Sequence, residues 1–77
     1  MKAMIEYIAR SLVDKPEAVV VNEFRSGDRL RLELSVARED MGRVIGKGGR
    51  VANAIRTLLR VAAEREGVQA TLDVLEP

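Results

Sequence analysis

The chain has 77 residues, of which 47% are hydrophobic and 32% charged, and its formal net charge is only +1. This length predicts one domain over residues 1–77 with one modest core. Cysteine and histidine are both absent, which excludes a disulfide framework and removes the commonest metal ligand and general base. No apolar run approaches the ~20 residues of a membrane span, and no signal peptide is recognisable. We therefore expect a cytoplasmic protein without a cofactor or a metal site.

The first half of the chain predicts one helix and a β-hairpin. Apolar residues recur on one face of residues 1–13, which indicates an amphipathic helix that ends before Pro16. Residues 18–24 are rich in valine and residues 30–36 alternate between apolar and polar, as strands do. A turn over residues 25–28 should join these two strands in a hairpin.

The second half predicts two helices and a last strand. Asp40 is placed to cap a short helix over residues 41–45, and Gly46 suits the left-handed position just after it. A long helix is expected over residues 50–66, and a strand over residues 68–74. The apolar stripe that should face the core from the long helix consists of Val51, Ile55, Leu58, Leu59 and Ala62.

The most informative segment is residues 44–51, Val-Ile-Gly-Lys-Gly-Gly-Arg-Val. Glycine is costly inside helices and strands, so three glycines within four residues indicate a loop with unusual backbone angles or a close neighbour. Lys47 and Arg50 suggest that this neighbour is an anion. The loop leads into a helix N-terminus, which carries free N–H groups and a partial positive charge. The segment therefore predicts a turn that contacts phosphate.

The distribution of charge supports this interpretation. Residues 41–60 contain five cations and no acid, whereas residues 1–40 carry a net charge of −1 and residues 61–77 carry −3. All the excess positive charge therefore lies in the glycine loop and the helices beside it. A local basic patch on a nearly neutral protein favours a polyanionic partner at one face.

Two nucleotide-binding loops are excluded by their spacing. A Walker loop needs four residues between its first glycine and the Gly-Lys pair, and a hydroxyl residue after the lysine. Here Gly42 is one residue too close to Gly46, and Gly48 occupies the hydroxyl position. The dinucleotide pattern G-x-G-x-x-G fails because Val51 stands where its last glycine should be.

A Gly-x-x-Gly turn between two helices instead resembles the loop with which KH domains clamp about four nucleotides of backbone. Gly46-Lys47-Gly48-Gly49, the apolar pair before it and the continuation to Arg56 are similar to the small stand-alone bacterial KH proteins of the KhpA family. The resemblance covers nearly the whole chain. It implies an α+β fold of the type II KH class, αββααβ, in which helices pack on one face of a three-stranded mixed sheet.

The resemblance also implies a function. Such a protein binds single-stranded RNA without catalysis, acts as an RNA chaperone in the bacterial cytoplasm, and pairs with itself or with a larger KH-containing protein. One departure concerns Ala52, where the KH pattern often has a large aliphatic residue that shapes the base groove. The end of the long helix, with Leu59 and the pair Ala62-Ala63, is one surface that we consider for self-association.

The residues predicted to contact RNA lie in and beside the loop. Lys47 and the loop glycines should hold phosphate, Arg43 and Arg56 should flank the strand, and apolar residues should both fill the core and support the bases. The full set is Arg43, Val44, Ile45, Gly46, Lys47, Gly48, Gly49, Arg50, Asn53 and Arg56. Tyr7 and Phe24 are the only aromatic residues, and neither is near the loop in sequence.

Three alternatives remain at the level of sequence. The chain could keep the KH fold as a protein-interaction adaptor, or it could bind single-stranded DNA, because such loops grip mainly the backbone. An enzyme is disfavoured, because only carboxylates, Lys47 or Tyr7 are available for acid–base chemistry.

Overall fold

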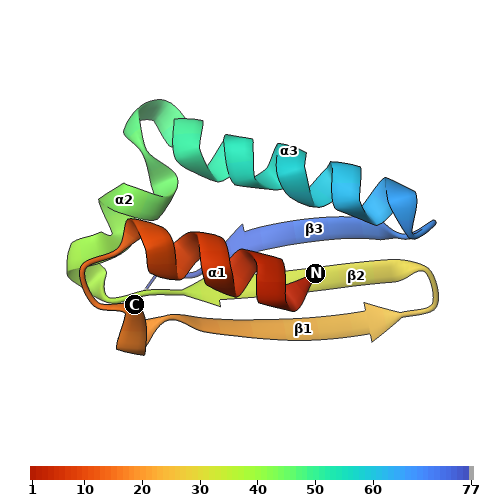
Figure 1. The fold of residues 1–77 in the computed structure, drawn as a ribbon, viewed down its shortest axis with the longest axis horizontal. Coiled ribbons are helices and arrows are strands. Elements are labelled where there is room, and N and C mark those ends of the chain that lie inside the picture. Colours follow the sequence, from red (N-terminus) through yellow and green to blue (C-terminus); the bar gives the residue numbers. More distant parts are fainter. Residues whose placement is uncertain (77) are drawn as a thin grey trace.

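The order of elements in the computed structural model is helix, strand, strand, helix, helix, strand, as the sequence predicts (Figure 1). The structure describes residues 1–76. Short 3₁₀ turns over residues 16–18, 38–40 and 47–49 connect the main elements. These are α1 (Lys2–Leu12), β1 (Val20–Ser26), β2 (Arg29–Ser35), α2 (Met41–Ile45), α3 (Arg50–Arg65) and β3 (Gln69–Val74).

The three strands form one mixed sheet in the order β1-β2-β3. β1 and β2 pair antiparallel as the predicted hairpin, and its turn is shorter than expected because the strands extend to Ser26 and Arg29. β3 pairs parallel with β2. This connection runs through α2 and α3, since parallel neighbours need a crossover.

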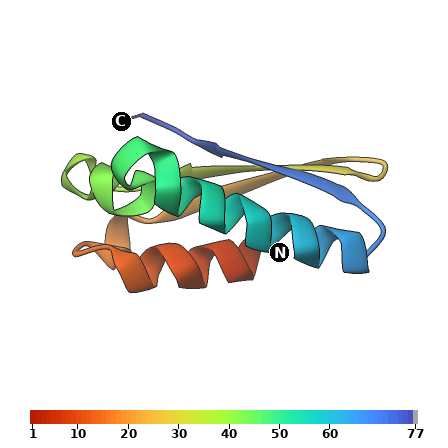
Figure 2. The same cartoon turned by 90° about the horizontal axis from the view of Figure 1, so that it is seen from above.

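The helices all lie on one face of the sheet, which leaves the other face uncovered (Figure 2). The inward residues Leu30, Leu32 and Leu34 of β2 are at most 2% exposed and pack with Ile5 of α1 and Leu59 of α3. The α+β fold class with helices on one face is therefore confirmed. Within residues 1–76, no helix is both long enough and apolar enough to cross a membrane.

The face that α3 turns to the sheet differs in part from the prediction. Its buried residues are Ala52, Ile55, Leu59 and Ala63, at helical spacing. Leu58, which we expected in the core, is 53% exposed. Leu58 falls beside the row that these buried residues form along the helix, on the solvent side.

Candidate nucleic-acid interface

The glycine loop joins α2 to α3 and projects at one end of the molecule (Figure 1). Gly46, Gly48 and Gly49 have φ angles of +75°, +65° and +82°. Residues other than glycine seldom adopt such positive φ angles, which explains why the segment contains three glycines. The glycine-rich turn between two helices is thus present as the sequence predicts.

Gly46 differs in detail from the expected left-handed helical residue. Its φ is positive, but its ψ of 168° lies in a region that is essentially restricted to glycine. A Cβ at this position would lie 2.6 Å from Val51 Cγ2 and 2.8 Å from the Val51 backbone nitrogen. Gly46 therefore allows the chain to double back against the first turn of α3.

The tip of the loop is open. A Cβ at Gly48 would have no heavy-atom neighbour within 4 Å. Lys47 is exposed and has no ion pair or side-chain hydrogen bond within residues 1–76. The lysine and the bare backbone beside it are therefore both accessible to an anion.

The N-terminus of α3 is not neutralised by the described part of the chain. Gly49 occupies the capping position without a side chain, and the first turn contains no acidic residue. Arg50 instead places a cation at the positive end of the helix dipole, where an anion is normally favoured. This arrangement concentrates positive potential at the loop.

Asp40 does not cap α2, so this prediction is wrong. Its side chain makes no capping bond and is 1% exposed. Its carboxylate instead accepts hydrogen bonds from the backbone N–H groups of Asp14, at 3.1 Å, and Lys15, at 3.0 Å. The carboxylate turns away from α2 because these two donors, which follow α1, are otherwise unpaired. Asp40 thereby ties the end of α1 to the start of α2.

The environment of Asp40 stabilises its charged form. The N–H group of Asp14 contributes most, and with that of Lys15 and the Arg43 guanidinium it holds the pKa of the Asp40 carboxyl below its ordinary value, although burial acts in the opposite direction. Arg43 Nε lies 3.2 Å from Asp40 Oδ1, and Arg43 donates a 2.8 Å hydrogen bond to Asp14.

Arg43 is therefore engaged by two carboxylates, those of Asp14 and Asp40. We expected it to flank the bound strand, but the structure turns it toward the loop after α1 rather than leaving it free. Val44 is 0% exposed and fills the core, which is one of the two roles expected of it, and its role as a support for bases stays a prediction. Ile45 is only partly buried.

Arg56 and Asn53 lie on the side of α3 that faces β3. Arg56 Nε donates a 3.1 Å hydrogen bond to the backbone carbonyl of Leu72, and its Nη1 donates one to Asn53 Oδ1. These bonds fix the guanidinium in place and leave its charge uncompensated by any carboxylate within residues 1–76.

A groove of about 250 Å³ follows α3 on this side. Its lining combines apolar side chains with two cations: Arg56, Leu59, Arg60, Ala70, Thr71 and Leu72. The sequence-based set of site residues did not include Arg60 or the β3 residues. Arg60 could have been added from the sequence, because it follows Arg56 by four residues and so shares its helical face. The β3 residues could not, because they reach this groove only through the parallel pairing of β3 with β2.

The site residues thus form two connected parts. Lys47, Gly48, Gly49 and Arg50 present cations and bare backbone, and Arg56 and Arg60 continue the positive charge along α3. The rise of a helix places Arg56 about 9 Å and Arg60 about 15 Å along the axis from Arg50. This arrangement is suited to a linear polyanion.

The chain is similar to known proteins over almost its full length. Residues 2–74 match the family model described as KhpA/KhpB, KH domain. A protein of Clostridium perfringens named RNA-binding protein KhpA is 51% identical over 97% of this chain and 100% of its own. The protein of the same name from Clostridium acetobutylicum is 48% identical over 97% of this chain and 100% of its own. The one from Chlamydia trachomatis is 45% identical over 99% of this chain and 97% of its own.

Proposed function

Because the chain belongs to the KhpA/KhpB family of KH domains, we propose that it binds single-stranded RNA without catalysis through its Gly46–Gly49 loop. The observation that carries the proposal is the loop itself, an exposed, glycine-built turn with an unpaired lysine at the N-terminus of a helix that has no acidic residue in its first turn. The names of the relatives support RNA as the ligand.

In this proposal the loop holds the sugar–phosphate backbone. Gly48 has no side chain to keep a phosphate away from the main chain, and Lys47 supplies a flexible point charge. The free N–H groups in the first turn of α3 add directed donors. None of these contacts depends on base identity, so they position the strand and do not select its sequence.

Bases then lie along the groove between α3 and β3. Leu59 and Leu72 provide its apolar floor, and Arg56 and Arg60 form charged parts of its lining. Asn53, one helical turn before Arg56, can hydrogen-bond to a base edge. Ala52 is 3% exposed on the buried side of α3 and is not part of the lining of this groove.

The affinity of one domain should be modest. Aromatic stacking contributes roughly 1–3 kcal/mol per base in single-strand binders, and the groove contains no aromatic residue. Binding that depends mainly on phosphate contacts weakens steeply as salt increases. A second domain would raise the affinity through avidity.

We also propose that the chain self-associates, or pairs with a larger KH protein, through the outer side of α3. Leu59 and Ala63, which we considered for this surface, are instead about 1% exposed and belong to the core. Leu58 and Val61 are 53% and 44% exposed and lie one helical turn apart on the same helix. These two side chains form the part of α3 that is suited to a partner.

The function can be tested by mapping the amide shifts of the ¹⁵N-labelled chain during titration with a short single-stranded RNA. The proposal predicts the largest shifts at residues 46–53 and along the Arg56 side of α3. A titration with DNA of the same sequence decides between the two nucleic acids. Shifts confined to other surfaces would place the RNA elsewhere and contradict the loop proposal, whereas the absence of shifts at low salt would favour the adaptor alternative.

A further inference from the structure

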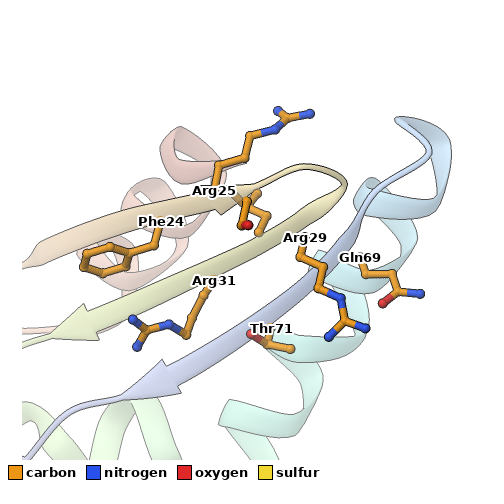
Figure 3. A pocket seen from close by; sticks show the side chains of 8 residues that line it. Phe24, Arg25, Arg29, Arg31, Gln69 and Thr71 are labelled. Atoms are coloured by element: carbon orange, nitrogen blue, oxygen red, sulfur yellow. The ribbon is translucent and has the colours of Figure 1, made fainter.

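The uncovered face of the sheet has a composition unlike that of an inert solvent surface. It carries the outward side chains of all three strands, among them Phe24 of β1, which is 47% exposed. Two arginines, Arg29 and Arg31, share this face with Phe24 near the β1–β2 turn, whereas Arg25 pairs with the inward Leu30 and its side chain extends away from Phe24 (Figure 3). This face lies opposite all three helices (Figure 2).

A hollow of about 320 Å³ opens between these side chains. In addition to Phe24, Arg29 and Arg31, its lining includes Arg25, Ser26, Leu30, Gln69 and Thr71, and it contains no acidic residue. The volume is at the lower end of the range for small-molecule sites. The hollow thus combines an aromatic ring, positive charge, and hydroxyl and amide groups within a space of ligand size.

Phe24 and Arg31 form an ordered pair at its centre. They face each other across β1 and β2, and the guanidinium carbon lies 4.6 Å from the ring centroid. Glu33 Oε2, at 2.7 Å, and Asp73 Oδ2, at 3.9 Å, form ion pairs with Nη1 of the same guanidinium. Aromatic rings and arginine planes are protein groups on which unpaired bases stack.

Of the arginines on the uncovered face, Arg29 keeps its charge available. Arg29 forms no ion pair within residues 1–76, and the side chain of Arg25 bonds only to the backbone carbonyl of Gly27. Arg29 projects beside Thr71 and Gln69 in the view of Figure 3. A nucleotide with its base in the hollow could therefore place its phosphate at the unpaired guanidinium of Arg29.

We propose that this hollow binds one nucleotide of single-stranded RNA, with its base against Phe24 and Arg31 and its phosphate at Arg29. The proposal rests on the function proposed above and adds a second contact to it. The glycine loop and the β1–β2 turn lie at opposite ends of the molecule, whose longest dimension is 35 Å (Figure 1). An RNA that reaches both sites must extend well beyond the roughly four nucleotides that a KH loop clamps.

The test compares labelled oligouridines of about 6 and about 20 nucleotides, one near the length that a KH loop clamps and one far beyond it, by fluorescence anisotropy. Phe24→Leu removes the ring but keeps an apolar side chain, and Arg29→Glu reverses the free charge. Each should weaken binding of the long oligomer roughly fivefold or more, as the loss of one stacked base or phosphate contact would, and should leave binding of the short one within about twofold.

Lys2→Glu is the matched control for charge, because Lys2 is exposed on α1 and forms no ion pair within residues 1–76. It should bind both oligomers as the parent does. An equal loss for Lys2→Glu and Arg29→Glu would overturn the proposal, because net charge alone would then explain the effect.

Loop variants separate this proposal from the one on which it rests. If both sheet variants bind the long oligomer like the parent while Lys47→Asp with Gly48→Asp does not, the hollow is no nucleotide site but the loop function stands. If the loop variant also binds normally, the loop function itself fails. A change of oligomeric state in Phe24→Leu without a change in RNA affinity would make this face a protein interface and refute the proposal.

Discussion

Val51 packs so closely against Gly46 that a Cβ on the glycine would lie 2.6 Å from Val51 Cγ2 and 2.8 Å from the Val51 backbone nitrogen. The contact joins the end of α2 to the first turn of α3. The contact sets the direction in which the Lys47–Gly49 turn projects, because only this turn lies between Gly46 and the start of α3 at Arg50. The shape of the loop therefore depends on one position where no side chain fits.

Gly46→Ala should destabilise the fold and displace the loop. The substitution adds a methyl group against the Val51 backbone and forces alanine into a region of φ and ψ that is restricted to glycine. We expect the free energy of unfolding in urea to fall by about 2–4 kcal/mol. RNA affinity should fall as well, even where the variant is folded.

Gly48→Ala is the control for this prediction. Its Cβ would project into open space, so only the cost of a positive φ remains, about 1 kcal/mol. Equal loss of unfolding free energy in both variants would show that the close contact of Gly46 with Val51 does not restrict which residue can stand at position 46.

Much of the fold could be predicted from the sequence because its determinants are local. The alternation of apolar residues along β2 and their helical spacing along α1 can each be read within one element. Gly46, Gly48 and Gly49 likewise indicate a turn at their own positions. The role of Asp40 could not be predicted, since its partners lie 25 and 26 residues away in the chain. The groove beside Arg56 also depends on the parallel pairing of β3 with β2, which no local pattern specifies.

Asp40→Asn should lower stability at neutral pH. Both carboxylate oxygens accept hydrogen bonds from backbone N–H groups, and one of them also lies beside Arg43. In asparagine one oxygen is replaced by an NH₂ group, which cannot accept a hydrogen bond from these donors. We expect the melting temperature to fall by roughly 5–15 °C, which circular dichroism will measure. Glu39→Gln, an exposed neighbour, should change it far less.

The same residue predicts a pH dependence. The folded pKa of Asp40 lies below its ordinary value, so its contribution to stability is fully present above the unfolded pKa of about 3.9 and is lost as the pH falls through the folded pKa. The parent should lose stability relative to Asp40→Asn below about pH 4. Parallel curves of stability against pH for the two proteins would contradict the assigned role.

Self-association should depend on the exposed apolar side of α3. Val61→Glu places a charge between Leu58 and Arg65 on a side chain that is 44% exposed in the single chain, so folding should be nearly unaffected. Sedimentation velocity should show a shift toward monomer. Ser11→Glu, which adds the same charge at an exposed position on α1, should sediment like the parent, and an unchanged Val61→Glu would exclude this surface.

The salt dependence of RNA binding should report the number of phosphate contacts. Lys47, Arg50, Arg56 and Arg60 have no carboxylate partner within residues 1–76. Three or four such contacts give a slope of log K against log salt of roughly −2 to −3 for a single strand. Lys47→Ala should reduce the steepness by about 0.7, and Lys2→Ala should not change it.

The most direct test of the central claim is the affinity of a labelled single-stranded RNA for Lys47→Asp with Gly48→Asp, compared with Lys47→Asn with Gly48→Asn. Both double variants place a short side chain at the positive φ of Gly48, at a similar cost of about 1 kcal/mol, and only the first adds negative charge. We predict at least a tenfold loss for the aspartate variant at low salt and a clearly smaller loss for the asparagine variant. An aspartate variant that binds RNA as tightly as the parent would contradict the account.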